Sequence, residues 1–291
     1  MGKFQIKSLV KGFLGHVYCK KISTIPLYAT CCMTLSGIFG NPVFGSQAWI
    51  TLVNQDKQRT ITQEGDCKKR FAPCSTFKIP LALMGYDGGF LKDEGTPTWP
   101  FQEGCVDFLP QWKQDQTPTS WIKNSCVWFS HVLTQKLGTE KFQDYVTQFS
   151  YGNQDLSGDK GENNGLTQSW LSSSLLISPE EQILFLEKLT NHTLPVSPSA
   201  HTLTKNILFV EALKNGWKLY GKTGSGKLLD EQGKRTNIQH GWFIGWIEKD
   251  KHVVLFAHHI ADEKEEDNWA SLRAKEGAKK KLISIIDSID A

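Results

Sequence analysis

Two side chains three residues apart, Ser75 and Lys78, have the types and the spacing that nucleophilic catalysis needs. Side chains at positions i and i+3 lie on the same side of a helix, so the amine can reach the hydroxyl. A serine hydroxyl becomes a good nucleophile only when a neighbouring base takes its proton. Because a proline fits only in the first turn of a helix, Pro80 predicts that a helix begins close to Ser75. Unpaired backbone N–H groups at that end would stabilise a developing oxyanion.

Lys78 can act as a base only if its amine is neutral, so its surroundings must lower its pKa. Apolar neighbours would deprive an ammonium group of water and favour the neutral amine. The apolar residues expected around it are Phe77, Ile79, Val127, Trp170 and Leu171. A lone Ser-x-x-Lys occurs often by chance, so residues elsewhere in the chain must decide its meaning.

The first 48 residues have the order of a secretory signal peptide. They carry five lysines and no acidic residue or arginine, followed by an apolar run over 22–44 and small residues at 46–48. We therefore expect residues 1–48 to be removed and the mature protein to be periplasmic, with an uncleaved N-terminal anchor as the competing interpretation. Without the five lysines, the formal net charge of +3 becomes −2. The mature protein is therefore not basic, which argues against a nucleic-acid partner.

The remaining cysteines are Cys67, Cys74, Cys105 and Cys126. An exported protein can form disulfides, and Cys67 and Cys74 are close enough in sequence to pair, but free buried thiols agree equally well with the sequence. The chain has no Cys-x-x-Cys pair and no His-Glu-x-x-His run, and we expect no metal site.

The distribution of strand and helix patterns predicts an α+β fold. A β-like run over 49–53 opens a sheet, strands over 218–222, 240–247 and 252–260 complete it, and a final helix from about residue 268 packs back on it. A helical lobe over about 93–206 is inserted between the sheet-forming segments. We expect an antiparallel sheet flanked by helices, in one catalytic domain over 49–291 with the site in a cleft between its two parts.

Local signals give sharper expectations inside this outline. We expect an irregular wall over 93–123, a helix closed by Gly138, a second helix capped by Thr139, and a loop over 154–168. Ser178 begins another helix with a proline at the first position and Glu181 three residues after the cap. In the final helix, the predicted apolar stripe consists of Leu272, Ala278, Leu282, Ile285 and Ile289.

Four short motifs, in order, resemble those of the class D, or OXA-type, serine β-lactamases within the wider group of penicillin-recognising serine enzymes. They are Ser75-Thr76-Phe77-Lys78-Ile79-Pro80, Ser125-Cys126-Val127, Tyr151-Gly152-Asn153 and Lys222-Thr223-Gly224. Each alone has an ordinary structural explanation, such as a turn or a strand end, but their joint order is specific and spans essentially the whole mature chain. Cysteine at the middle of the second motif is a departure from the usual pattern.

The resemblance implies a role for each matching residue. Ser75 attacks the β-lactam carbonyl, Ser125 relays a proton to the lactam nitrogen, and Lys222 keeps that region positive. The backbone N–H groups of Ser75 and Ser225 form the oxyanion site. Substrate-binding residues are Thr223, Gly224, Ser225 and Arg273, which face the substrate carboxylate, and Tyr151 and Asn153, which shape the floor of the site. Val127 belongs to the apolar surroundings of Lys78. The assignment of Arg273 depends only on its distance from the end of the chain.

The resemblance also implies that Lys78 reacts with carbon dioxide to give a carbamate, a carboxylate-like base for both acylation and deacylation. Trp170 has an indole N–H as its only donor, which suits it to hold a carbamate oxygen. We expect no other cofactor.

The expected function is therefore hydrolysis of a small-molecule β-lactam through an acyl-enzyme on Ser75. One alternative is a D-alanyl-D-alanine peptidase, and another is a β-lactam sensor domain that stays acylated. We expect a monomer or homodimer with no stable membrane insertion after signal cleavage.

Overall fold

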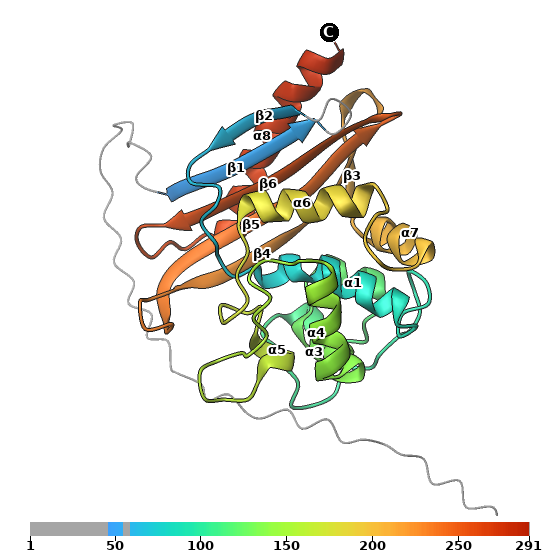
Figure 1. The fold of residues 1–291 in the computed structure, drawn as a ribbon, viewed down its shortest axis with the longest axis vertical. Coiled ribbons are helices and arrows are strands. Elements are labelled where there is room, and N and C mark those ends of the chain that lie inside the picture. The colour runs from blue at the N-terminus through green and yellow to red at the C-terminus, as the bar shows by residue number, and fades with distance from the viewer. Residues whose placement is uncertain (1–45, 55–58, 291) are drawn as a thin grey trace, which may run out of the picture.

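The computed structural model describes residues 46–54 and 59–290, and its centre is a six-stranded antiparallel sheet (Figure 1). The strands are β1 (Ser46–Asn54), β2 (Arg59–Glu64), β3 (Phe209–Ala212), β4 (Lys218–Leu229), β5 (Arg235–Lys249) and β6 (His252–Asp262). Their order across the sheet is β2-β1-β6-β5-β4-β3. Because β1 pairs with β6, segments from the two ends of the described chain build one sheet. Most of the predicted signal peptide, 1–48, lies outside the described residues. Residues 46–48 belong to β1 and pair with β6.

The helices occupy the chain between β2 and β3 and the stretch after β6. They are α1 (Lys78–Asp87), α2 (Pro118–Asn124), α3 (Val127–Leu137), α4 (Thr139–Gln148), α5 (Gly165–Gln168), α6 (Pro179–Thr190), α7 (Pro198–Ile207) and α8 (Ala270–Asp290). Three short 3₁₀ helices accompany them, η1 (Cys74–Phe77), η2 (Pro110–Trp112) and η3 (Lys214–Gly216). The predicted α+β architecture with helices inserted between sheet-forming segments is confirmed.

One face of the sheet is covered by α8, which contacts β4, β5 and β6. The helix buries Ala270, Ala274, Ala278, Leu282 and Ile286 against apolar side chains of these strands. The predicted stripe was wrong at Leu272, whose side chain is 53% exposed. Small alanines at 270, 274 and 278 let the helix approach the sheet, and Leu272 lies off that face.

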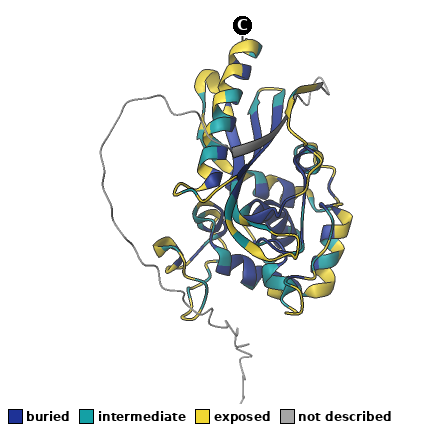
Figure 2. Ribbon diagram, turned by 90° about the vertical axis from the view of Figure 1, so that its left-hand side faces the viewer, coloured by how far each residue is buried: buried dark blue, intermediate teal, exposed yellow. Residues whose placement is uncertain are grey.

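The opposite face of the sheet packs against the helical region, where α6 contacts β1, β5 and β6 and η1 contacts β4 and β5. Figure 2 shows the resulting interior as a continuous buried zone. Trp242, Phe243, Ile244 and Trp246 of β5 are all buried, so the predicted covering of this strand on both faces is confirmed. Because η1 contacts β4 and β5, the segment that contains Ser75 packs directly on the central sheet.

Several local predictions need correction. The end of the predicted irregular wall forms α2, capped by Thr117, and the predicted loop over 154–168 ends in the short helix α5. Helix α4 does begin at Thr139, but its N-cap is Gly138, which has a φ of +75° and no side-chain cap. Strand β3 was missed because its four residues are half exposed and carry no alternating pattern.

No disulfide links the four cysteines in the described part of the chain. Cys74 is buried beside His240, with 3.7 Å between Sγ and Nε2, and burial raises the pKa of its thiol to about 11. The Cys67–Cys74 disulfide that the sequence left open is therefore absent from this structure.

The start of α6 gives a test of the local folding signals. Ser178 Oγ accepts from the Glu181 N–H and Glu181 Oε2 accepts from the Ser178 N–H, a reciprocal capping box. We expect Ser178→Ala to lower the free energy of unfolding by about 1 kcal/mol, because one first-turn N–H loses its acceptor. Urea unfolding measures this, with Thr202→Ala, which removes an exposed hydroxyl of α7, as the control. Equal stabilities of Ser178→Ala and the control would contradict the role of the cap.

Candidate active site

The predicted nucleophile lies in η1, directly before α1 begins at Lys78. Ser75 Oγ is 3.2 Å from Lys78 Nζ, so the spacing read from the sequence becomes a hydrogen bond. Ser75 is partly exposed, whereas Thr76 and Phe77 beside it are buried. The preceding residue, Cys74, donates its N–H to the Trp170 carbonyl at 2.9 Å. The nucleophile turn is thereby tied to the segment that carries the predicted tryptophan.

Lys78 is completely buried in the structure. Burial lowers the pKa of its amine to about 8, against a smaller opposing effect of the Cys126 and Cys74 thiols. A substantial fraction of the amine is therefore neutral near pH 8, where an exposed lysine would be almost fully charged. The geometry and the lowered pKa together allow Lys78 to take the proton of Ser75.

A second lysine lies close to a second serine. Lys222 Nζ of β4 donates to Ser125 Oγ at 3.0 Å and to the Thr223 carbonyl at 3.0 Å. Burial, followed by the positive charge of Lys78, holds the pKa of Lys222 well below its usual value. Ser125 has a left-handed backbone, with φ of +55°, at the turn between α2 and α3, which directs it toward β4. The next residue, Cys126, is fully buried, so its small side chain fits the middle position of the motif.

The glycine of the Lys-Thr-Gly motif lets β4 approach the nucleophile turn. A Cβ placed on Gly224 would lie 2.7 Å from the Pro73 carbonyl oxygen and 3.1 Å from the Thr76 nitrogen. A Cβ on Gly226 would likewise collide with Cys74 Sγ at 2.4 Å. The strand and the turn therefore touch through their backbones, which fixes Ser75 against β4.

Trp170 lies at the bottom of the site beside the aromatic rings of the helical region. Its ring stacks on Phe77 at a centroid distance of 5.5 Å and meets Phe142 edge-on at 6.1 Å. The indole is fully buried, and Nε1 has no hydrogen-bond partner among the described residues. An unused N–H donor in an apolar interior is rare, so it marks a position where a bound group can accept a hydrogen bond.

His131 is a polar member of this region that the sequence analysis missed. Its ring lies 6.0 Å from Trp170, and its buried Nε2 also has no partner among the described residues. Burial and the charge of Lys78 lower the pKa of His131 to about 4, so the ring is neutral at pH 7. The only feature of the sequence that could have indicated His131 as a site residue was its position one helical turn after Val127.

Tyr151 and Asn153 support the site through hydrogen bonds to neighbouring residues. The Tyr151 hydroxyl donates to Gln182 Oε1 at 3.4 Å, and Gln182 Nε2 donates to Thr76 Oγ1 at 3.2 Å. Asn153 accepts from the Leu176 N–H at 2.9 Å and donates to the Ser174 carbonyl at 2.8 Å. Asn153 thus holds backbone segments in place, and Tyr151 is linked through Gln182 to the Thr76 side chain. Neither side chain hydrogen-bonds to Ser75 in the structure.

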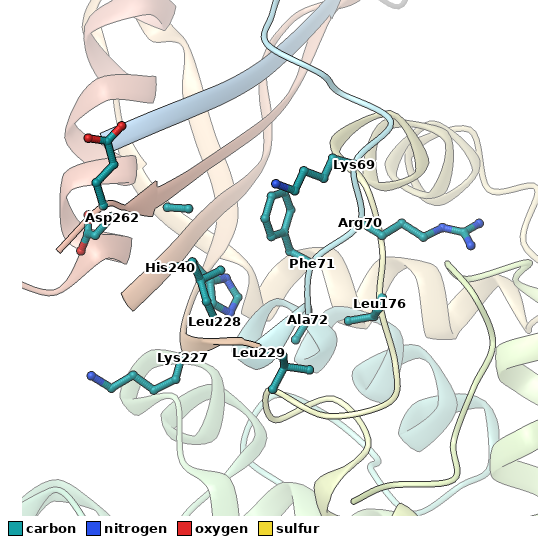
Figure 3. A pocket seen from close by; sticks show the side chains of 12 residues that line it. Lys69, Arg70, Phe71, Ala72, Leu176, Lys227, Leu228, Leu229, His240 and Asp262 are labelled. Atoms are coloured by element: carbon teal, nitrogen blue, oxygen red, sulfur yellow. The ribbon is translucent and has the colours of Figure 1, made fainter. Parts of the chain in front are cut away.

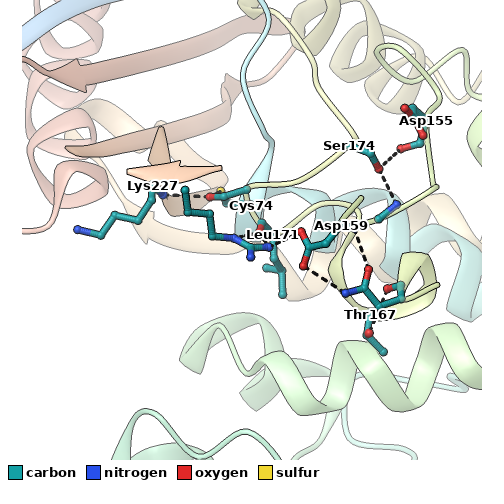
Figure 4. A network of polar contacts seen from close by, with 11 residues as sticks. Cys74, Asp155, Asp159, Thr167, Leu171, Ser174 and Lys227 are labelled. Atoms are coloured by element: carbon teal, nitrogen blue, oxygen red, sulfur yellow. Dashed lines mark hydrogen bonds and ion pairs between the residues drawn. The ribbon is translucent and has the colours of Figure 1, made fainter. Parts of the chain in front are cut away.

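The segment that delivers Trp170 is fastened to the end of β4 and to β5 by a polar network (Figure 4). Arg235 donates to Asp159 at 2.8 Å and to the Leu171 carbonyl at 3.0 Å. Ser172 Oγ accepts from the Lys227 N–H at 3.0 Å. The loop is therefore fixed on both sides of Trp170.

Arg273 lies near the start of α8, as predicted, but its guanidinium is already paired with a carboxylate of the protein. Its guanidinium binds the Asp262 carboxylate through two hydrogen bonds of 2.8 and 2.7 Å. Ser271, two residues earlier, accepts a 2.6 Å hydrogen bond from the Ser225 hydroxyl. Ser271 is therefore a second hydroxyl beside the predicted carboxylate site, one that only the three-dimensional structure reveals.

A cavity of about 390 Å³ lies between the segment 69–72 and the ends of β4 and β6 (Figure 3). It is lined by Phe71, Ala72, His240, Asp262 and the end of β4 at 227–229, together with their neighbours. None of the predicted catalytic residues lines it. Its wall is nevertheless close to the nucleophile turn, because His240 contacts Cys74.

Comparison with known proteins agrees with this geometry. The family profile described as "Penicillin binding protein transpeptidase domain" matches residues 46–283. Beta-lactamase OXA-9 of Klebsiella pneumoniae is 43% identical over 223 residues, 75% of this chain and 80% of that protein. Beta-lactamase OXA-1 of Escherichia coli is 39% identical over 254 residues, 86% of this chain and 88% of that protein. The solved structure of the class D β-lactamase OXA-427 is 44% identical with a TM-score of 0.79, covering 83% of this chain and 99% of that chain.

The chain belongs to the class D β-lactamases. It is thus a hydrolase that acts on β-lactams, as the motif resemblance implied. None of the helices in the described ranges has both the length and the apolar character of a membrane span.

Gly224 gives a test of how this class D β-lactamase positions its serine. We expect Gly224→Ala to lower kcat/KM by about 100-fold or more, since a displacement of about 1 Å at the reacting atoms has that effect. The added methyl group must push the Pro73–Thr76 backbone away from β4. Hydrolysis kinetics with thermal unfolding measure the effect, with Gly95→Ala, where a Cβ would make only an ordinary 3.6 Å contact with Asp93 Oδ1, as the control for the loss of a glycine. Full activity of Gly224→Ala would show that the close approach is not required.

Proposed function

We propose that this class D enzyme hydrolyses β-lactams through a covalent acyl-enzyme on Ser75, with Lys78 as the base. The observation that carries the proposal is the 3.2 Å contact between Ser75 Oγ and the Nζ of a completely buried lysine. An exposed lysine in the same place would be charged at neutral pH and could not accept the proton.

In the first half of the reaction, the Ser75 oxygen forms a bond to the lactam carbonyl carbon as its proton passes to the base at position 78. Negative charge then develops on the carbonyl oxygen, and the backbone N–H groups of Ser75 and Ser225 stabilise it. The carbon–nitrogen bond of the ring breaks, and the nitrogen takes a proton through Ser125. Lys222, 3.0 Å from Ser125 Oγ, supports this transfer and attracts the anionic substrate.

In the second half, water must attack the acyl group, and the same base takes a proton from it. The residues around Lys78 fit a carbamate formed with carbon dioxide. Carbon dioxide combines only with a neutral amine, which burial of Lys78 favours, and the unused Nε1 of Trp170 is a donor for one carbamate oxygen. Such a group supplies a carboxylate-like base. Val127 and Leu171, both partly buried and packed against the core, belong to the apolar surroundings.

The substrate carboxylate has a set of polar partners at the end of the site near α8. Thr223 and Ser225 lie on β4, and Ser271 adds a hydroxyl 2.6 Å from that of Ser225. The Arg273 guanidinium is bound by Asp262. We therefore propose that the hydroxyls bind the substrate carboxylate directly, and that Arg273 acts on this carboxylate only electrostatically, from within its pair with Asp262.

We further propose export to the periplasm by cleavage of an N-terminal signal. The support is the order of basic, apolar and small residues in the first 48 positions. The oligomeric state that we propose is a monomer or homodimer.

The acyl-enzyme makes Ser75→Ala a direct test. We expect this variant to lose β-lactam hydrolysis by at least about 1,000-fold while it keeps its fold, because the nucleophile itself is removed and Ser75 is partly exposed. Mass spectrometry of the wild-type enzyme mixed with a penicillin should show a transient adduct on the peptide that contains Ser75. A permanent adduct would indicate a sensor instead, and hydrolysis without an adduct would rule out the covalent route.

The carbamate is tested by isotope labelling. With ¹³C-labelled bicarbonate, we expect a carbamate signal in the ¹³C NMR spectrum that is lost in Lys78→Ala and weakened in Trp170→Phe, which keeps an aromatic ring but has no N–H donor. The signal and the activity should both fall as the pH drops below about 8, because protonation of the Lys78 amine removes the reacting form. A signal in Trp170→Phe equal to that of the wild type would exclude Trp170 as a carbamate donor. Full activity at acid pH without carbon dioxide would exclude the carbamate.

A further inference from the structure

His131 presents an unused polar atom beside the Ser75–Lys78 site. The residue lies on α3, four positions after Val127, so the two side chains share one face of the helix. His131 is only 8% exposed, and no residue in the described ranges forms a hydrogen bond with its Nε2. Buried polar atoms without a partner are rare in folded proteins, so this one needs an explanation.

The hydrogen bond on the other side of the ring decides what His131 Nε2 offers. Burial and the charge of Lys78 lower the pKa of His131 to about 4, against a smaller effect of a hydrogen bond to the Thr167 backbone carbonyl. A carbonyl can only accept, so a ring nitrogen donates to it, and because Nε2 has no partner this donor is Nδ1. A neutral imidazole has a single N–H, which leaves a lone pair on Nε2. His131 is therefore a buried hydrogen-bond acceptor.

Trp170 supplies the complementary group. Its Nε1 is a buried donor without a partner in the described part of the chain, and its ring lies 6.0 Å from the ring of His131. The separation of the two rings is fixed, because α3 packs on α5 and Thr134 Oγ1 of α3 donates to the Leu166 carbonyl of α5 at 2.5 Å. One unused donor and one unused acceptor thus lie in the same buried region without bonding to each other.

Lys78 is the reactive member of this region. Its charge acts on the His131 ring, and Phe77 beside it stacks on Trp170 at 5.5 Å. When the neutral Lys78 amine combines with carbon dioxide, its nitrogen forms a bond to the carbon, and one electron pair of a C=O bond moves onto oxygen. One of the two amine protons then leaves to water. The product has one N–H, which donates, and two oxygens, which only accept.

The donor and the acceptors of this product match the two unused groups. The geometry points to His131 as a positioning residue for the proposed carbamate, with its Nε2 accepting from the carbamate N–H while Trp170 Nε1 donates to a carbamate oxygen. The bond between nitrogen and carbon has partial double-bond character, as in a peptide. Holding the N–H and one oxygen therefore fixes the plane of the group and the direction of the second oxygen, which acts as the base. The inference rests on the proposed function, because it uses the carbamate on Lys78.

A histidine suits this role better than a purely structural one. An imidazole with a free lone pair is more costly to bury than an apolar side chain of similar size, which would fill the same space between α3 and Trp170. The neutral form also matters, because an imidazolium has N–H groups on both sides and no acceptor.

The test measures the affinity of the protein for carbon dioxide. ¹³C NMR at increasing concentrations of labelled bicarbonate gives the dissociation constant of the carbamate in the wild type, His131→Gln and His131→Leu, and kcat is measured in the same solutions. Glutamine keeps an acceptor at the end of its side chain, whereas leucine fills the space without one. His258→Leu is the control for loss of a buried histidine, since His258 bonds to the Ala274 carbonyl of α8 on the other face of the sheet. Urea unfolding reports the stability of each variant.

We expect His131→Leu to weaken carbon dioxide binding by about tenfold, as is typical for one lost hydrogen bond to a charged group, and His131→Gln by less than about threefold. Saturating bicarbonate should restore most of the kcat of His131→Leu, because it refills the carbamate. In wild-type protein labelled with ¹⁵N-histidine and kept free of carbon dioxide, Nε2 of His131 should be the unprotonated ring nitrogen. The His131 signals are assigned by their loss in His131→Gln.

Carbon dioxide affinity of His131→Leu equal to that of the wild type would overturn the inference. So would equal losses in His131→Leu and His131→Gln, an equal loss in His258→Leu, a kcat of His131→Leu that bicarbonate does not restore, or a proton on Nε2. A wild-type protein without any carbamate signal would instead overturn the proposed carbamate, and this inference with it, so the two failures are distinguishable.

Discussion

The burial of Lys78 beside Ser75 is the constraint on which the rest of the site depends. A charged ammonium in an apolar interior is costly, and the folded protein meets that cost by shifting the lysine toward its neutral form. The same surroundings that exclude water also make the amine a nucleophile for carbon dioxide. One packing arrangement therefore supports both the proposed deprotonation of Ser75 and the proposed modification of Lys78.

The two buried lysines of the site, Lys78 and Lys222, differ in their hydrogen-bond partners. Lys222 is also buried, and the charge of Lys78 lowers its pKa further, so the two amines oppose each other's protonation. Lys222 has a serine hydroxyl and a backbone carbonyl as acceptors, which accommodate an ammonium group. Lys78 has hydrogen-bonding contact with Ser75 and thiols nearby, which do so less well. If Lys78 becomes an anion, the repulsion becomes attraction, and the charge of Lys222 is stabilised.

The sequence predicted the parts of the site that depend on short spacing. Ser75 and Lys78 meet because they lie three residues apart at the start of a helix, and the capping box at Ser178 follows from similarly local rules. Long-range features were not predictable in this way. The need for Gly224 comes from the Pro73 carbonyl, about 150 positions earlier in the chain, and the pairing of Arg273 with Asp262 depends on how α8 follows β6.

The same distinction explains the errors in the fold. Leu272 fits a helical stripe by spacing, but which face of a helix is buried depends on how closely it approaches the sheet, and here alanines define that face. Thr139 has a residue type typical of caps, yet the chain reaches α4 through a glycine with positive φ and needs no side-chain cap. Propensity thus located the elements, and tertiary packing decided their orientation.

The position of Trp170 is coupled to the sheet rather than to its own loop alone. Its carbonyl accepts from Cys74, Leu171 is held by Arg235, and Ser172 is held by the backbone of Lys227. Two of these partners come from the ends of β4 and β5, and the third precedes the nucleophile. A displacement of the β4–β5 hairpin would therefore move the indole relative to Lys78. Because the nucleophile turn contacts β4 at Gly224 and the tryptophan segment contacts it at Lys227, this strand positions the Trp170 N–H relative to Lys78, as the proposed carbamate requires.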